Sequence, residues 1–186
     1  METSDTSAAD YKTSSGFRKL REGLLIQPFK NGRDNVPAEV DAVPGLFIGS
    51  YGAATNLAAL VKAGITHVLC VSPSLSLQFP ETFTYLQLKV ADQTSVSIAA
   101  FFDKAFAFID SALSLGGKVL VHCFMGRSRS ATIILAYLIT RHGMTLSDAL
   151  GEVRRARPQA QPNTGFHREL IALEAKQKQI REQGRA

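Results

Sequence analysis

The sequence predicts an α/β fold with a central, mostly parallel sheet of four to five strands that is flanked by helices on both faces. Short apolar runs alternate along the chain with longer segments whose apolar residues recur at helical spacing. Strands that alternate with helices form largely parallel sheets that are covered on both sides. A length of 186 residues and a hydrophobic content of 45% suit one domain with a short extension.

The predicted domain opens with a strand and a short helix. The apolar run GLFIG at 45–49 predicts the strand, and ATNLAALVKAG at 54–64 predicts the helix. Thr55 or Asn56 is suited to cap the start of this helix, and Gly64 is suited to end it.

Two strands, a long helix and a further strand follow. THVLCVS at 66–72 is an apolar, β-branched run typical of a buried strand, and FTYLQLKV at 83–90 predicts the next one. The segment 98–117 has apolar residues at helical spacing and ends on two glycines, so it predicts a helix. KVLVH at 118–122 predicts the last strand.

Three helices complete the predicted domain. The segment 130–143 is an apolar helix that ends at a glycine. The helix at 145–157 begins at Thr145, with Asp148 at the capping-box position. The segment 163–183 predicts the last helix.

Residues 1–37 form an N-terminal extension ahead of the predicted domain at 38–183. Residues 1–15 are rich in Ser, Thr, Ala and Asp, and we expect them to be disordered. The chain start lacks the pattern of a secretory signal, and no window has the roughly 18–20 apolar residues of a membrane span. There are only two cysteines, whereas secreted domains usually carry more disulfide partners. We therefore expect an intracellular protein, in the cytoplasm or the nucleus.

The charge pattern and the cysteine and histidine spacing exclude some classes of partner. Lys and Arg outnumber Asp and Glu by 21 to 16, and most of this excess lies in 151–186. The aromatic and glycine motifs of common RNA-binding modules are missing, and no Cys or His cluster has zinc-ligand spacing. We expect no nucleic-acid partner, no metal and no cofactor.

The loop after the strand 118–122 carries the strongest functional signal. It reads HCFMGRSRS, and it places Cys123 and Arg129 six residues apart, just before an apolar helix. A tight loop between a strand end and a helix start turns backbone N–H groups inward, and the helix start adds partial positive charge. The predicted anion cradle consists of Phe124, Met125, Gly126, Arg127, Ser128 and Arg129.

The side chains of this loop suit phosphate chemistry. Arg129 can grip two oxygens of a phosphate. Cys123 lies at the floor of the loop, where donors that bind phosphate also stabilise a thiolate. A thiolate that faces a bound phosphate is a nucleophile aimed at phosphorus. Ser128 and Ser130 supply hydroxyls near the sulfur or the helix start.

The segment HCFMGRSRSATIILAYL resembles the signature loop of the dual-specificity protein phosphatases, within the cysteine-based phosphatase superfamily. VPGLFIGSYGAATNLAALVKAGITHVLCVSP, GGKVLVHC and RPQAQPNTGF extend the resemblance over about residues 38–175. It implies the cysteine-based phosphatase fold in an atypical, single-domain enzyme, and metal-independent hydrolysis of phosphoryl esters through a cysteinyl-phosphate. It also implies that Cys123 is the nucleophile, Arg129 the phosphate clamp and Ser130 the hydroxyl that assists thiolate departure.

Such a reaction needs a general acid, because an alkoxide or a phenoxide is a poor leaving group. Asp92 follows the strand 83–90 and matches the acid of the family. We expect it to protonate the leaving oxygen and then to activate water. The alternative is that Asp92 only turns the loop, as aspartate often does.

Three further residues have expected supporting roles. His122 is expected to bond beneath the loop and to tune the thiolate. Asn163 matches a family asparagine near the loop and is also suited to cap the last helix. Neighbouring strands lie about 4.8 Å apart, which puts Cys70 within disulfide reach of Cys123. Cys70 therefore either captures an oxidised Cys123 or is a buried core cysteine.

The predicted substrates are proteins that carry phosphotyrosine, phosphoserine or phosphothreonine. Arg127 leaves an alternative open, because its added positive charge also suits a phosphoinositide, a phosphorylated RNA or a phosphosugar. The loop lacks the pair of lysines of the phosphoinositide-directed branch. An inactive phosphoprotein-binding module is a further alternative, although Cys123, Arg129 and Asp92 are all present.

The extension carries one candidate docking segment. RKLREGLLI at 18–26 places three bases ahead of two apolar residues. This resembles the motif by which some dual-specificity phosphatases bind MAP kinases. Such clusters are also common on amphipathic helices, so a helix that packs on the domain or faces solvent is the alternative.

Overall fold

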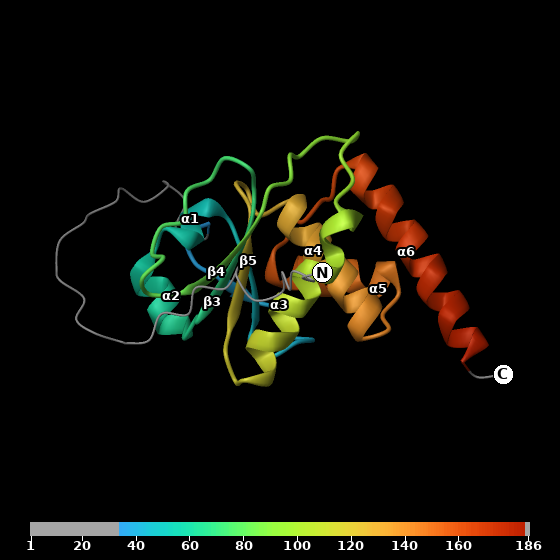
Figure 1. Ribbon diagram of the computed structural model, residues 1–186, viewed down its shortest axis with the longest axis horizontal. Helices are drawn as coiled ribbons and strands as arrows, with labels where there is room; N and C mark the ends of the chain where they lie inside the picture. The colour runs from blue at the N-terminus through green and yellow to red at the C-terminus, as the bar shows by residue number, and fades with distance from the viewer. Residues whose placement is uncertain (1–33, 185–186) are drawn as a thin grey trace, which may run out of the picture.

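A sheet of five strands forms the centre of the computed structural model, which describes residues 34–184 (Figure 1). The strand order is β1-β2-β5-β3-β4. β1 runs antiparallel to β2, and every other neighbouring pair is parallel. This confirms the predicted, mostly parallel sheet. The strands are β1 (Ala38–Glu39), β2 (Leu46–Gly49), β3 (His67–Val71), β4 (Thr84–Leu88) and β5 (Val119–His122).

Helices cover both faces of this sheet, as the sequence predicts. α1 and α2 lie on one side, and α3, α4, α5 and α6 lie on the other, with α6 outermost (Figure 1). The helices are α1 (Tyr51–Ala54), α2 (Leu57–Ala63), the 3₁₀ turn η1 (Ala99–Phe101), α3 (Phe102–Ser114), α4 (Arg129–Arg141), α5 (Leu146–Ala156) and α6 (Thr164–Gln183).

The alternation of side chains along each strand divides the core into two. In β5, Val119 and Val121 belong to the larger core against α3 and α4, whereas Leu120 belongs to the smaller core against α2. Successive strand residues point to opposite faces, which produces this division. α4 is buried along nearly its whole length, and this explains why its sequence is apolar throughout.

Local capping signals set the predicted helix ends. Asn56 caps α2 by accepting a hydrogen bond from the Ala59 N–H at 3.1 Å, and Gly64 ends the helix in the left-handed conformation at a φ of 73°. Thr145 caps α5 by accepting from the Asp148 N–H at 3.1 Å. Both caps agree with the sequence.

Three details differ from the predicted elements. β1 and α1 were not predicted, because elements of two and four residues are too short to carry a periodic pattern. The predicted helix at 98–117 begins as the 3₁₀ turn η1 before α3 starts. The first amides of that turn bond to a side chain of α6, a contact that the local sequence does not contain.

Most of the N-terminal extension lies outside the described residues. This holds for the expected disorder at 1–15 and for the candidate docking segment at 18–26. Within residues 34–184, no helix combines the length and the apolar character needed to cross a bilayer.

The parallel strands bring three loops to one edge of the sheet. Cys70 of β3 lies opposite His122 of β5, and Gly49 of β2 lies opposite His122 on the other side. The carboxyl ends of β2, β3 and β5 are therefore level, and β4 ends beside β3. Ligands of such sheets bind at this edge.

Candidate active site

The loop between β5 and α4 is held open by hydrogen bonds from outside it. The carbonyl of Phe124 accepts from the Tyr51 N–H at 3.0 Å, and the carbonyl of Arg127 accepts from the Gln161 N–H at 2.8 Å. The carbonyls between them, of Met125 and Gly126, accept from the Arg157 guanidinium at 2.8 and 3.2 Å. These carbonyls thus all face outward.

The outward carbonyls determine where the amides of the loop point. In a trans peptide the N–H lies opposite the carbonyl, and the structure has no cis peptide among the described residues. The amides that follow these carbonyls therefore turn toward the centre of the loop, as an anion nest requires. The start of α4, at Arg129, adds the partial positive charge of a helix N-terminus.

Arg157 is a functional residue that the sequence analysis missed. It is only 4% exposed, and it forms an ion pair with Asp34 at 3.1 Å in addition to its bonds to the loop. A buried guanidinium is stable only with such partners. Arg157 is the first residue of RPQAQPNTGF, a segment that resembles the family. Its role depends on tertiary contacts, which no local pattern reveals.

Cys123 lies at the floor of the loop, where it is 1% exposed. Its Sγ is 3.3 Å from the Oγ of Ser130, a fully buried residue in the first turn of α4. A thiolate can only accept a hydrogen bond, so the Ser130 hydroxyl donates whenever Cys123 is ionised.

Arg129 reaches across the site from the first residue of α4. Its Nη1 donates to the carbonyl of Val90 at 3.3 Å, which fixes the side chain against the loop after β4. Its buried Nε has no hydrogen-bond partner among the described residues. The guanidinium therefore keeps a donor for an anion.

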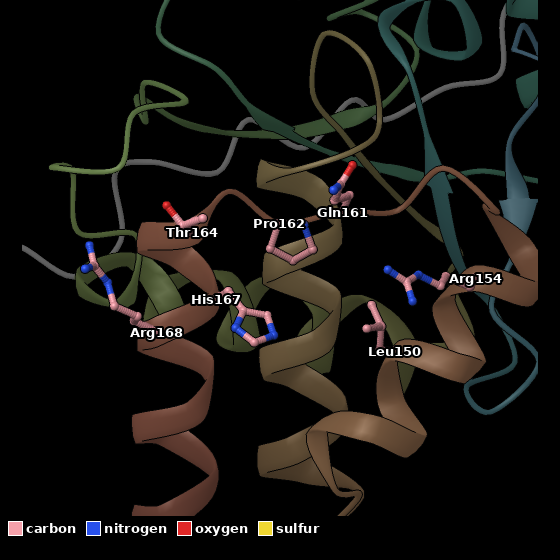
Figure 2. A pocket seen from close by; sticks show the side chains of 7 residues that line it. All are labelled: Leu150, Arg154, Gln161, Pro162, Thr164, His167 and Arg168. Atoms are coloured by element: carbon pink, nitrogen blue, oxygen red, sulfur yellow. The ribbon is translucent and has the colours of Figure 1, made fainter.

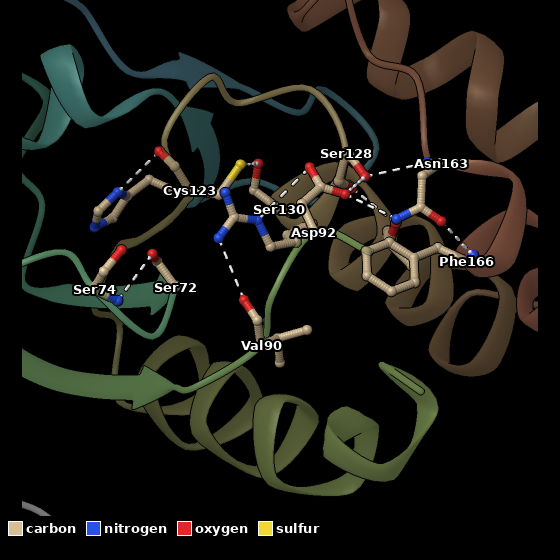
Figure 3. Close-up of polar contacts among 12 residues, drawn as sticks. Ser72, Ser74, Val90, Asp92, Cys123, Ser128, Ser130, Asn163 and Phe166 are labelled. Carbon is tan, nitrogen blue, oxygen red and sulfur yellow. Dashed lines mark hydrogen bonds and ion pairs between the residues drawn. The ribbon is translucent and has the colours of Figure 1, made fainter. Parts of the chain in front are cut away.

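Asp92 joins three segments that are distant in sequence (Figure 3). Its Oδ1 accepts from the Ser128 hydroxyl at 2.7 Å and from the Asn163 Nδ2 at 2.8 Å. Its Oδ2 lies 3.8 Å from the Nε of Arg129. Asn163 also caps α6 by accepting from the Phe166 N–H at 3.0 Å. Asn163 thus caps the helix, as predicted, and lies at the site as well.

Comparison with known proteins identifies the family. Residues 46–176 match the family described as dual specificity phosphatase, catalytic domain. The chain belongs to the dual-specificity phosphatases. It is 40% identical over 181 residues to dual specificity protein phosphatase 1 of Arabidopsis thaliana, an alignment that covers 92% of this chain and 90% of that protein.

Solved structures of related phosphatases share the fold. The structure of DUSP15 is 35% identical, with a TM-score of 0.72, over 80% of this chain and 94% of that one. The human tyrosine phosphatase-like serine/threonine/tyrosine-interacting protein is 38% identical, with a TM-score of 0.71, over 76% of this chain and 97% of that one. The predicted family, fold class and enzyme class, a dual-specificity protein phosphatase, are thereby confirmed.

His122 is buried beneath the loop of the phosphatase. It is 2% exposed, and its Nδ1 is 3.4 Å from the carbonyl oxygen of Cys123. Burial lowers the pKa of His122 to about 4, and the positive charge of Arg129 adds to this effect. A neutral imidazole fits the expected supporting role of His122 beneath the loop.

Cys70 and Cys123 are both buried, free thiols. Burial raises the pKa of Cys70 to about 12, and the neighbouring charge of Cys123 acts in the same direction. Cys70 of β3 pairs with His122, the last residue of β5, so Cys123 directly follows the end of the adjoining strand. A disulfide between them in the oxidised phosphatase stays a prediction.

The remaining loop residues form the rim of the site. Phe124 and Met125 are 47% and 55% exposed, so they present apolar surface beside the cradle. The Arg127 guanidinium donates to the Oε1 of Gln161. Its positive charge therefore lies on the side of the site that faces the segment before α6.

Proposed function

We propose that the chain hydrolyses phosphotyrosine, phosphoserine and phosphothreonine in proteins, without a metal, through a cysteinyl-phosphate on Cys123. The observation that carries this proposal is the loop from Phe124 to Arg127, whose outward carbonyls leave the amides that follow them turned toward the centre of the loop. Preorganised amide donors of this kind stabilise the charge that develops on a transferring phosphoryl group.

In the first step, the loop amides and Arg129 hold the non-bridging oxygens of the phosphate. The Cys123 thiolate attacks phosphorus, the S–P bond forms and the bond to the leaving oxygen breaks. Asp92 donates its proton to that oxygen. Two donors already occupy Oδ1 of Asp92, so we infer that this proton is carried on Oδ2, the oxygen nearer Arg129.

In the second step, Asp92 is a carboxylate and accepts a proton from water. The water oxygen attacks phosphorus, the P–S bond breaks and inorganic phosphate forms. The Ser130 hydroxyl, 3.3 Å from the sulfur, stabilises the departing thiolate by donating to it.

The rim of the site supports a protein substrate over the phosphoinositide, phosphorylated RNA or phosphosugar alternatives. Phe124 and Met125 offer apolar contacts to an aromatic ring or a peptide. The one base between Cys123 and Arg129, Arg127, is directed to Gln161. The inactive-module alternative is disfavoured because Cys123, Arg129 and Asp92 are assembled at one site.

A panel of substrates tests this proposal. The wild-type protein, in the presence of a chelator, is given phosphotyrosine, phosphoserine and phosphothreonine peptides, phosphoinositide vesicles, a 5′-phosphorylated RNA and a phosphosugar. We expect turnover to favour peptides, to survive chelation and to vanish in Cys123→Ser, while Cys70→Ala retains it. A preference for a non-protein phosphate, or peptide turnover by the wild type that is no higher than by Cys123→Ser, would contradict the proposal.

We also propose that segment 18–26 binds a MAP kinase in the cytoplasm or the nucleus, on the resemblance of its bases and apolar residues. Replacement of Arg18, Lys19 and Arg21 by alanine in the full chain should weaken capture of a phosphorylated MAP kinase by the Cys123→Ser variant. Unchanged capture of the kinase would mean that segment 18–26 does not bind it.

A further inference from the structure

A basic cavity of about 430 Å³ lies between α5 and α6, beside the site already described. Figure 2 shows Leu150 and Arg154 on the α5 side, His167 on the α6 side and Pro162 between them, with Arg168 on the outer side of α6. Gln161 and Thr164 complete its wall.

This cavity continues into the active site. A neighbouring hollow of about 560 Å³ is lined by Asp92, Ser128 and Arg127, and it shares Gln161, Pro162 and Thr164 with the basic cavity. A peptide that places its phosphate in the loop therefore has a surface along which to extend toward Arg154.

The charges of the cavity are all of one sign. No carboxylate lines it, and among residues 34–184 neither Arg154 nor Arg168 is in an ion pair. The guanidinium of Arg154 is nevertheless fixed, because its Nε donates to the carbonyl of Ala160 at 3.2 Å. Both Nη groups of Arg154 are without a partner among residues 34–184, so they keep their donors in the planar arrangement that matches a carboxylate or a phosphate.

We propose that this cavity binds an acidic side chain of the phosphoprotein substrate, near the phosphorylated residue in sequence. Arg154 grips the anion, Arg168 adds positive potential, and Leu150 and Pro162 contact the apolar part of the peptide. The proposal rests on the proposed function and narrows it to phosphorylated residues that have an acidic neighbour at a fixed distance.

A set of peptides tests the cavity. Each carries one phosphotyrosine and a single glutamate that is moved stepwise along either side, and its matched control has glutamine at the same position. A parallel set carries phosphothreonine in place of the glutamate, which separates a second phosphate from a carboxylate. For the wild type we expect glutamate to raise kcat/KM by about 5-fold over glutamine at one or two adjacent positions, mainly through KM, as for an exposed ion pair.

Variants then assign the effect to the cavity. Arg154→Ala should remove the preference for glutamate, Arg168→Ala should reduce it, and Lys178→Ala, on the exposed distal part of α6, should retain it. All three should hydrolyse a small aryl phosphate at the wild-type rate, because none of these residues lines the loop. High salt should also remove the preference.

The outcomes separate this proposal from the function on which it rests. Normal hydrolysis with equal kcat/KM for glutamate and glutamine at every position would overturn the cavity proposal alone. A preference that Arg154→Ala and Arg168→Ala both retain would do the same. Failure of the wild type to hydrolyse any peptide would overturn the proposed function instead.

Discussion

The two carboxylate oxygens of Asp92 have different surroundings, and this difference supports an acid role. Oδ1 accepts from Ser128 and Asn163, whereas among residues 34–184 Oδ2 has only the Arg129 guanidinium, at 3.8 Å. A residue that only turned its loop would need no such contacts with two other segments. The Ser128 and Asn163 bonds also fix the direction in which a proton on Oδ2 would leave.

The substitution Asp92→Asn tests this role, since it keeps the shape and most hydrogen bonds but removes the proton. The rate of the wild type should follow a bell in pH, because Cys123 must be ionised while Asp92 is protonated. Asp92→Asn should lose the alkaline limb and slow aryl phosphates by about 10²-fold, with smaller losses for better leaving groups.

Measurement of kcat/KM against pH, for a series of aryl phosphates and for phosphoserine and phosphothreonine peptides, checks this. Ser128→Ala is the control, because it removes one hydrogen bond to Asp92 but keeps the carboxyl group. If Asp92→Asn slows every substrate equally and keeps the bell, Asp92 only shapes the loop.

At this scale, the sequence predicts a site most directly where its residues are close together in the chain. Cys123, Arg129 and Ser130 lie within eight positions of one another, in a loop between a predicted strand and an apolar helix, and this whole arrangement predicts an anion site. Arg157 bonds to the same loop from about 30 residues away. Only the packing of α5 against the loop reveals its position.

At the scale of elements, the loop depends on close packing against β2. Gly126 has a φ of 65°, and an added Cβ would lie 2.6 Å from the carbonyl oxygen of Gly49 and 2.9 Å from the Nε of Arg157. The Gly49 carbonyl is part of the backbone of β2, so it cannot move away from an added Cβ as a flexible side chain could. The loop geometry therefore requires glycine at this position for space as well as for conformation.

Gly126→Ala should consequently lower kcat/KM for an aryl phosphate by at least about 10-fold, because the displaced loop misplaces its amides. Gly116→Ala is the matched control: Gly116 has a φ of 72°, but a Cβ there would contact nothing within 4 Å. This control should cost about 1–2 kcal/mol of stability and leave the rate unchanged. Equal rates for both variants would show that the loop tolerates the side chain.

The loop that carries Asp92 is fixed by α6. Glu169 accepts from the amides of Ile98 and Ala99, both at 3.0 Å. A Cβ on Gly165 would lie 2.2 Å from the carbonyl oxygen of Thr94, so the helix and the loop are in direct backbone contact. α6 thus contacts the loop after β4 at its middle, through Thr94, and at its C-terminal end, through Ile98 and Ala99.

Glu169→Ala should therefore affect acid catalysis, with phosphoserine and phosphothreonine slowed by about 10-fold and good aryl leaving groups nearly unaffected. Glu174→Ala is the matched control, because Glu174 caps α5 through the Leu146 N–H at 2.7 Å, away from Asp92. Each should lose about 1 kcal/mol of stability, as for a lost cap. If the rates of the two variants depend on the leaving group in the same way, Glu169 has no role in positioning Asp92.

The sequence predicts helix ends that are set by local capping residues. It does not predict elements that depend on contacts with distant parts of the chain. Asn56, Gly64 and Thr145 cap their helices with groups a few residues away. Within the described part of the chain, β1 pairs only with β2, and the 3₁₀ turn before α3 depends on Glu169. These contacts form only after the chain has packed.

At the scale of the whole molecule, burial of His122 links stability to pH. Its pKa is about 4 in the folded chain and 6.5 when unperturbed. Between these values the unfolded chain binds a proton that the folded chain does not, so stability falls as pH is lowered through this range. The contribution of His122 is about 3 kcal/mol between pH 7 and pH 4.

Urea unfolding at a series of pH values measures this effect. Between pH 7 and pH 4, the free energy of unfolding should fall by about 3 kcal/mol more for the wild type than for His122→Gln. The glutamine variant cannot bind the proton. Parallel curves for the two proteins below pH 6.5 would mean that His122 is protonated in the folded chain.

The assembly of the site is a property of the whole sheet. Its parts come from the loops after β4 and β5 and from the start of α6, and the parallel register brings these to one edge. The alternation of strands and helices predicts that edge. It does not predict that Arg127 would face Gln161 or that a basic cavity would continue the site, because both depend on how α5 and α6 pack.

The measurement that tests the central claim most directly is mass spectrometry of the phosphoenzyme. Asp92→Asn, which lacks the group that activates water, is mixed with a phosphotyrosine peptide, quenched rapidly and digested. We expect one phosphoryl group on Cys123, and none when Cys123→Ser is treated in the same way. Turnover of the peptide with no phosphorylated protein, or a phosphoryl group on any residue other than Cys123, would contradict the cysteinyl-phosphate mechanism.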